Sequence, residues 1–324
     1  MKKLSFVLAA ALAIVGCAKE PVNSGSNQPE GICEITFNLS PGTTKVTTTD
    51  ISKENEVNVS TLQVFVFNSD GSVDAFSGRE NGNNLTLSCT LGDKTVYALV
   101  NAPLIRQVES LTGFLAETSQ FSDNQLNQFV MLGSLNVKLS SSKAKVTIPV
   151  KRLVCKIVIE KITRVDETED STKTLSIVGM CLKHVAGTTN LGLNAQAESW
   201  YNTVTNEKLT SPDNVVAMTT QYNINSAPIA NKETYATSHT FYAYPNIVSS
   251  TYPTILSIEH AIEGDDTPYY YPIQIENNLE ANKVYTITEL KLTRRGGTDD
   301  DKAQIYFTLK VEDWEIGGSW PESF

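Results

Sequence analysis

The chain has 324 residues, a formal net charge of −10, 19% charged residues and 40% hydrophobic residues. The negative charge argues against a nucleic-acid partner, because the phosphates of DNA or RNA would repel the chain. It also argues against a basic surface that lies along a membrane. Thr, Ser, Asn and Val are abundant, which is typical of an extracellular β protein and argues against a helical cytosolic enzyme.

The first residues have the layout of a secretory signal peptide. A basic start, Met1–Lys3, precedes an apolar run over Leu4–Val15, which ends at Gly16 and Cys17. The run has about 12 residues, whereas a membrane-spanning helix needs about 20. The end of the run resembles a bacterial lipobox, which predicts that the Cys17 thiol is acylated and that Cys17 becomes the N-terminus. The alternative is a plain signal peptide in which Cys17 is incidental.

The segment after Cys17 is rich in Ser, Asn, Gly, Pro and Gln and is predicted to be a tether rather than a packed domain. We therefore assign residues 1–16 to the signal peptide and 17–31 to a lipidated tether. The remaining chain, about 295 residues, fits two domains of ordinary size better than one. We place the N-terminal domain at 32–150 and the C-terminal domain at 151–324.

The first half of the mature chain predicts short strands and one helix. Cys33, Ile35, Phe37 and Leu39 alternate with polar residues, which predicts a half-buried strand. Further strands are predicted at residues 62–67, 85–91, 95–101, 135–139 and 146–150. The apolar residues of the segment 104–115 follow a spacing of 3.6 residues, which predicts a helix on the outside of the sheet or at one end of a sandwich.

The second half repeats this style. A long strand is predicted at 153–162, and others at 175–181, 240–244, 255–259, 269–275 and 284–292. Ile305, Phe307, Leu309 and Val311 then alternate with polar residues in a last strand. Many short strands separated by turn signals, with little helix, predict an all-β protein built of sandwiches or barrels.

No motif for catalysis or metal binding is present. The three histidines lack a metal-ligand spacing, and there is no nucleophile elbow, P-loop or dinucleotide-binding glycine motif. The acidic clusters Asp265–Asp266 and Asp299–Asp301 match no EF-hand loop and are interpreted as solvated turns. We therefore predict that the protein is not an enzyme and needs no cofactor or metal.

Four cysteines remain after Cys17, and none of them forms a C-x-x-C pair. They are Cys33, Cys89, Cys155 and Cys181. Three of the four lie within apolar strand patterns and are predicted to be small buried hydrophobic residues. A disulfide is the alternative if the compartment is oxidising.

Short motifs follow the lipobox in a particular order. They are Leu62–Phe67 with Asp70 and Gly71, Val96–Ala102, Arg152–Ile157, Asn282–Ile287, and Leu309–Val311 with Trp314. This order resembles the fimbrillin family of Bacteroides and Porphyromonas relatives, the lipoprotein-derived subunits of pili. The resemblance implies two transthyretin-like, Greek-key β-sandwich domains with a minor helix in the N-terminal one.

The resemblance also implies a route of assembly. A surface protease cuts after a basic residue behind the first strand, that strand leaves, and a strand of a neighbouring subunit fills the groove. Mapped onto this chain, the removable strand is 32–39, the cut follows Lys45, and Lys53 is the fallback site. Family sites often carry Arg, but no Arg precedes Arg79 here, so the protease must accept Lys.

The donated strand is expected near the C-terminus. Ile305, Phe307, Leu309 and Val311 have the alternation that a donor needs. The alternative is that this strand closes its own domain and that the tail Trp314–Phe324 is the donor.

The predicted function is that of a structural subunit of a cell-surface fimbria at the outer membrane. The expected partners are other copies of the chain, related pilus subunits, the processing protease, the membrane through the lipid on Cys17, and host or bacterial surface ligands. One alternative is an anchor or accessory subunit that keeps its lipid. Another is a glycan-binding lipoprotein that uses aromatic residues, with candidates Trp200, Tyr201, Tyr242, Tyr244 and Tyr269–Tyr271.

Overall fold

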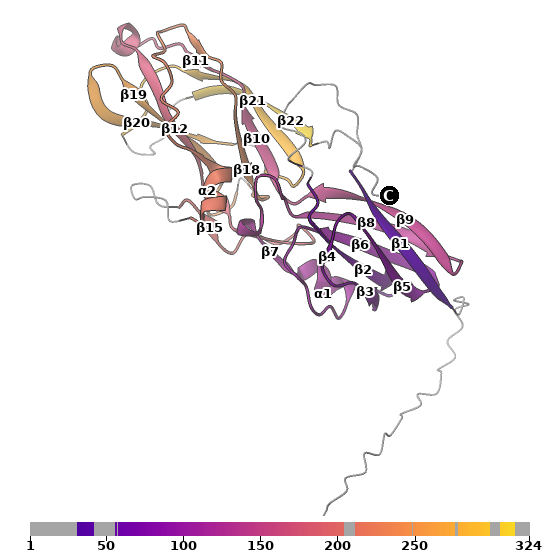
Figure 1. Cartoon of the computed structure of the whole chain (residues 1–324). Helices are drawn as coiled ribbons and strands as arrows, with labels where there is room; N and C mark the ends of the chain where they lie inside the picture. The colour runs from indigo at the N-terminus through magenta and orange to yellow at the C-terminus, as the bar shows by residue number, and fades with distance from the viewer. Residues whose placement is uncertain are drawn as a thin grey trace, which may run out of the picture.

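The computed structural model describes residues 31–41, 56, 58–203, 211–247, 249–275, 278–298 and 305–314. These residues form mostly strands, with two short α-helices (Figure 1). The expectation of an all-β protein with two sandwich units is confirmed.

One large sheet belongs to the first half of the chain. Its strand order is β3-β2-β6-β8-β9-β1-β5, with β4 beside β2. The strands are β1 Ile32–Pro41, β2 Thr61–Asn68, β3 Val73–Phe76, β4 Glu80–Asn81, β5 Asn84–Thr90, β6 Gly92–Val100, β8 Met131–Leu139 and β9 Lys143–Arg152. Figure 1 shows this sheet in indigo to magenta, with β1 lying beside β9.

Two further sheets belong to the second half. The first has the order β17-β11-β21-β10-β18 with β22 beside β21, and the second has the order β16-β12-β19-β20. The strands of the first are β10 Cys155–Ile159, β11 Ile162–Arg164, β17 Thr234–Tyr235, β18 His239–Ala243, β21 Lys283–Leu292 and β22 Ile305–Asp313. Those of the second are β12 Leu175–Lys183, β16 Thr220–Gln221, β19 Ile255–Ile262 and β20 Asp265–Gln274.

Small elements connect and cover these sheets. Two small two-stranded sheets pair β13 (Val185–Ala186) with β15 (Trp200–Tyr201) and β7 (Thr118–Gln120) with β14 (Thr188–Asn190). The helices are α1 (Leu111–Ala116) and α2 (Asp213–Thr219), with 3-10 turns η2 (Phe121–Asp123) and η3 (Glu169–Thr172). Because β7 comes from the first half and β14 from the second, this pairing joins the two halves.

The two halves repeat one local arrangement of strands. In the first, β1 lies parallel to β9 and antiparallel to β5. In the second, β10 lies parallel to β21 and antiparallel to β18. The first strand of each half is therefore hydrogen-bonded on both sides.

Strand β2 separates two hydrophobic cores, which explains why its sequence is almost continuously apolar. Leu62, Val64 and Val66 lie in a core with the inward side chains of β1, and Phe65 and Phe67 lie in the other. The second core continues into the second half of the chain, where Phe121 and Tyr244 meet edge-on with ring centroids 5.2 Å apart.

The predicted helix over 104–115 is present only from Leu111, where the Ser110 hydroxyl caps it by accepting from the Gly113 N–H at 3.1 Å. The preceding segment is held in a non-helical path by the buried side chain of Gln63. Its amide oxygen accepts from Ile105 N–H at 2.9 Å and its amide nitrogen donates to the Pro103 carbonyl at 2.9 Å. These bonds to the sheet compete with the helix that the apolar spacing predicts.

The long strand predicted at 153–162 is divided into β10 and β11. Both lie along β21 in one parallel register, which pairs Ile159 with Ile287 and Ile162 with Leu290. They differ in their antiparallel neighbour, which is β18 for β10 and β17 for β11. The prediction was thus correct for the path of the chain and wrong for its continuity.

Candidate functional site

Strand β1 fills a slot between two other strands. Its register places Phe37 opposite Leu85 of β5 and Val146 of β9. Eight residue pairs join β1 to β9 and seven join it to β5. Removing β1 would therefore leave both β5 and β9 with unpaired backbone groups, which is a template for another strand.

The inward face of β1 is part of the core of the first half. Cys33, Ile35 and Phe37 are fully buried, and Leu39 is 8% exposed. Burial of a Leu, Ile or Phe side chain contributes about 1.5–3 kcal/mol, so the slot loses a large apolar contribution when β1 leaves. These are the side chains that the alternation in the sequence predicted.

The predicted donor residues lie on β22, which pairs with β21 of its own chain. Within the part of the chain that the structure describes, β21 is the only strand that pairs with β22. Phe307 and Leu309 are half-buried against the core and Val311 is 40% exposed. Strand β22 is therefore less buried than β1, although the two have the same apolar spacing.

A buried carboxylate joins the segment that precedes β2 to the end of β22. Glu56 is 4% exposed. Its carboxylate accepts from Lys156 Nζ at 2.8 Å, from the Tyr242 hydroxyl at 2.7 Å and from Trp314 Nε1 at 3.1 Å. Its main-chain carbonyl accepts from Arg152 Nε at 3.0 Å, and the Arg152 guanidinium lies 4.1 Å from the centre of a Trp314 ring.

The Glu56 cluster stabilises charged groups that would otherwise be unfavourable in the core. Burial lowers the pKa of Arg152 to about 10, and the nearby Glu56 opposes that shift. The guanidinium therefore keeps its charge at neutral pH. Glu56 was missed in the sequence because it stands in a polar segment without periodicity, and nothing in its surroundings marks it as buried.

The predicted lipidation site and the two predicted cleavage sites lie outside the described residues. These residues are Cys17, Lys45 and Lys53. Lys45 follows the last residue of β1, Pro41, by four positions, and Lys53 precedes Glu56 by three. Both lysines therefore stand in the sequence between β1 and the rest of the sheet.

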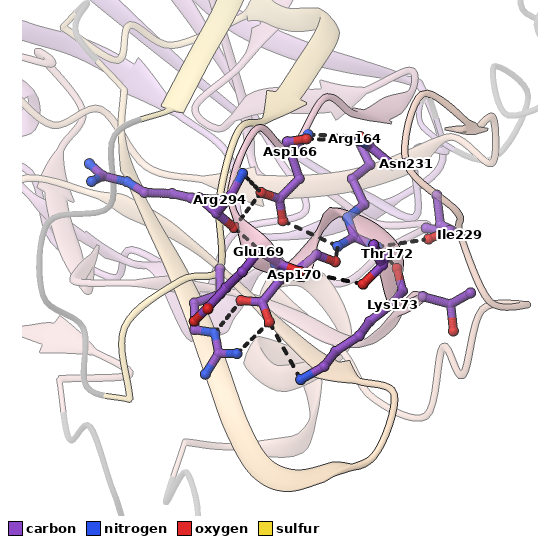
Figure 2. Close-up of polar contacts among 12 residues, drawn as sticks. Arg164, Asp166, Glu169, Asp170, Thr172, Lys173, Ile229, Asn231 and Arg294 are labelled. Carbon is purple, nitrogen blue, oxygen red and sulfur yellow. Dashed lines mark hydrogen bonds and ion pairs between the residues drawn. The ribbon is translucent and has the colours of Figure 1, made fainter.

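A second polar network lies around η3 in the second half (Figure 2). Arg164 is 1% exposed and donates to the Asp166 carboxylate at 3.2 Å and to the Asp170 carbonyl at 2.6 Å. The Asp170 carboxylate accepts from Nε and Nη2 of Arg295, each at 2.6 Å. These bonds lower the pKa of Asp170 and raise that of Arg295. The charges satisfy one another, which indicates that the network fixes the fold rather than performing chemistry.

The aromatic candidates do not form one exposed surface. Tyr242, Tyr244, Tyr269 and Tyr271 are buried, whereas Trp200, Tyr201 and Tyr270 are half-buried. Tyr242 and Tyr244 bond to other buried groups, such as Glu56 and Ser119. Trp200 lies beside the exposed Tyr252, with ring centroids 5.0 Å apart.

Of the two predicted acidic clusters, only Asp265–Asp266 lies among the described residues. Asp265 accepts from the Tyr269 hydroxyl at 2.7 Å and lies 3.7 Å from Arg295 Nη1, while Asp299–Asp301 lie outside the described residues. Among the described residues, no three His, Cys, Asp or Glu side chains are grouped as metal ligands. Among the same residues, no helix has both the length and the apolar character needed to cross a bilayer.

A comparison with known families identifies the family of this chain. The family model described as the major fimbrial subunit protein FimA matches residues 33–194, which is half of the chain. The chain belongs to the FimA family of major fimbrial subunits. The match begins within β1 and ends beyond β14, so it includes the slot and the contact between the two halves. This is a family of structural proteins and not of enzymes.

Solved structures show the same fold. A candidate cell adhesion protein of Bacteroides eggerthii is 20% identical, with a TM-score of 0.67 over 90% of this chain and 98% of that one. One of Parabacteroides distasonis is 12% identical, with a TM-score of 0.64 over 88% and 98%. A fimbrilin of Porphyromonas gingivalis is 14% identical, with a TM-score of 0.60 over 88% and 98%. No curated protein matches the chain by sequence.

Proposed function

We propose that this FimA-family subunit is exported as a lipoprotein through Cys17 and polymerises by strand exchange at the outer membrane. A cut after Lys45 releases β1, and β22 of a neighbouring copy takes its place between β5 and β9. We also propose that the two sandwich domains divide near residue 150, where β9 ends and β10 begins.

The match between β1 and β22 is the observation that carries this proposal. Cys33, Ile35, Phe37 and Leu39 lie at every second position of β1, and Ile305, Phe307, Leu309 and Val311 lie at every second position of β22. Four apolar side chains on one strand face can therefore replace four others without a change of register. The half-buried side chains of β22 would become more deeply buried in the slot.

The net gain of strand exchange is smaller than the gross energies, because a donated β22 first gives up its pairing with β21 and the partial burial of Phe307 and Leu309. Four side chains such as those of β22 contribute about 6–12 kcal/mol when they are fully buried, at about 1.5–3 kcal/mol each. Backbone pairing adds about 0.5–1.5 kcal/mol per hydrogen bond, and association costs about 4–15 kcal/mol. Because the intact chain fills its own slot, proteolysis provides the switch.

The first experiment uses the mature chain from Ala18, treated with a Lys-specific protease. Products are followed by gel filtration, electron microscopy and N-terminal sequencing. We expect a new N-terminus at Val46 and rods of joined subunits. Lys45→Gln is expected to prevent the terminus at Val46, and Lys45→Gln/Lys53→Gln to prevent assembly as well, whereas Lys53→Gln alone leaves both unchanged.

The role of β22 is tested by two substitutions on opposite faces of the strand. Leu309→Asp places a charge on the half-buried face, and Thr308→Asp places the same charge on the exposed face. We expect cleaved Leu309→Asp protein to accept a strand from wild-type subunits but to donate none, so that it caps growing rods. Thr308→Asp is expected to polymerise normally.

Other outcomes would favour the competing functions. A folded monomer that resists cleavage and keeps its lipid on Cys17 would favour an anchor or accessory subunit. A monomer that is cut after Lys45 but never assembles would contradict the strand-exchange proposal. A monomer that binds oligosaccharides and does not assemble would instead favour a glycan-binding lipoprotein.

A further inference from the structure

Cys33 of β1 lies directly opposite Cys89 of β5 in the antiparallel register. Both side chains point into the core of the first half, where Cys33 is fully buried and Cys89 is 5% exposed. Two residues that face each other on the same side of a strand pair have neighbouring Cβ atoms, and both cysteines are free thiols in this structure.

The hydrogen-bond pattern gives the separation of the two backbones. Leu91 N–H donates to the Gly31 carbonyl at 3.0 Å, and Leu39 N–H donates to the Asn83 carbonyl at 3.2 Å. Hydrogen-bonded pairs alternate along an antiparallel ladder, so Cys33 and Cys89, two residues from the first of these pairs, form such a pair too. The Cα atoms of such pairs are about 5.5 Å apart, which lies within the 4.4–6.8 Å range of disulfides, roughly at its centre.

We propose that Cys33 and Cys89 form a disulfide that fastens β1 to β5 and retains the strand after the chain is cut. Two thiols lose two protons and two electrons to a disulfide oxidant, such as oxidised glutathione or a disulfide-bearing oxidoreductase. The new S–S bond joins the two strands, and the oxidant becomes two thiols. A dithiol reductant reverses the step.

The bond forms before the sandwich closes. Burial raises the pKa of the Cys33 thiol, and burial, Asp74 and Cys33 together raise the pKa of Cys89 to about 11. Because the thiolate is the reactive form, the folded protein oxidises slowly. The two thiols are accessible while the exported chain is still unfolded, and β1 pairing then holds them together.

Reduction of the bond requires that the reductant reach it, because Cys33 and Cys89 are both buried in the closed sandwich.

The inference rests on the proposed function and adds a second condition for assembly, which is reduction of the Cys33–Cys89 bond. A cut at Lys45 alone leaves the fragment that runs from Cys17 to Lys45, with its lipid, attached to β5. The slot stays filled and the subunit stays at the membrane. Only a subunit that is both cut and reduced can accept a donor strand.

Peptide mapping tests the bond without any substitution. The mature chain is refolded from denaturant with reduced and oxidised glutathione, alkylated in denaturant without reductant, and digested with trypsin. We expect peptides 20–45 and 80–94, which carry Cys33 and Cys89, to be joined, while Cys155 and Cys181 are alkylated. Alkylation of both Cys33 and Cys89, or their pairing with other cysteines, would overturn the proposal.

Assembly after cleavage tests the consequence. Oxidised wild-type protein, cut at Lys45, is expected to form at least tenfold fewer polymers than the same sample after reduction. Cys33→Ala/Cys89→Ala protein is expected to assemble equally well with and without reductant, and Cys155→Ala/Cys181→Ala protein serves as the matched control. Equal assembly of linked and reduced wild type would overturn the retention of β1. Failure of every cut sample to assemble would overturn the strand-exchange function and leave the mapped bond standing.

Discussion

The carboxylate of Glu56 accepts a hydrogen bond from the indole nitrogen of Trp314 at 3.1 Å, across 258 positions of sequence. Glu56 precedes β2, and Trp314 directly follows β22. The residue that lies shortly before β2 and the residue that directly follows β22 therefore meet in one buried cluster.

Truncating Glu56 is expected to destabilise the intact subunit strongly. Glu56→Ala leaves the buried Lys156 without its ion-pair partner and Arg152 without a nearby negative charge, which costs about 3–5 kcal/mol. Glu56→Gln keeps the shape of the side chain and is expected to cost about 1–3 kcal/mol. Urea unfolding at pH 7 measures both, with exposed Glu80→Ala as the control. A Glu56→Ala protein as stable as wild type would show that the cluster contributes nothing.

Phe37→Ala is expected to destabilise the uncut precursor but not the polymer. The side chain is fully buried in the slot, so the free energy of unfolding of the uncut chain should fall by about 3–5 kcal/mol. After cleavage and reduction β1 is absent from the slot, and polymers of the variant should be as stable as wild-type polymers. Glu34→Ala, on the exposed face of β1, is the control. A destabilised polymer would mean that β1 stays in the fibre.

His260 is expected to make the subunit less stable in acid. The ring is fully buried, and its centroid lies 4.4 Å from that of Tyr271. Neither ring nitrogen makes a well-formed hydrogen bond among the described residues. Burial lowers the pKa of His260 to about 3, and Arg164 and Arg295 act in the same direction.

The sign of the effect follows from proton binding. The unfolded chain takes up a proton below a pKa of about 6.5, while the folded chain does not until about pH 3. The contribution of neutral His260 to the free energy of unfolding is therefore complete above pH 6.5, and it falls by about 1.4 kcal/mol per pH unit below that pH. Urea unfolding between pH 7 and pH 4 should show a shallower decline for His260→Phe than for wild type or His184→Asn. Equal slopes of the free energy of unfolding against pH for His260→Phe and wild type would contradict this role of His260.

Gly133→Ala is expected to weaken the pairing of β8 with β9. A Cβ at this position would meet the Pro149 carbonyl oxygen and would lie 2.9 Å from Ile148 Cγ2. Because the first of these atoms belongs to the backbone, the strands must move, at a cost of about 1–3 kcal/mol. In the control, Gly113→Ala, the nearest atom is Ser110 Oγ at 3.4 Å. The melting temperature of Gly133→Ala should fall, and an unchanged value would contradict the prediction.

Strands were predictable where one face is buried and the other is not. The alternation in β1 and β22 predicted both strands, and in β1 it also predicted the buried side chains, because side chains of a strand point to opposite faces in turn. The same reasoning failed at 104–110, where the apolar spacing is helical but bonds from Gln63 hold the backbone in another path.

The candidate site was predictable only in part. The slot follows from the apolar face of β1 together with the family resemblance. The Glu56 cluster could not be predicted, because its five members come from four separate stretches of the sequence that only the fold brings together. The opposition of Cys33 and Cys89 likewise depends on a register that no local pattern specifies.

The slot belongs to the first half of the chain and β22 to the second, so an exchange between copies joins unlike surfaces. Such a head-to-tail contact would give an open filament with two different ends wherever the rotation between subunits does not close a ring. A subunit that keeps β1 can give a strand but cannot receive one, so it terminates growth at one end. The ratio of uncut to cut subunits would then set the average length of the fibre.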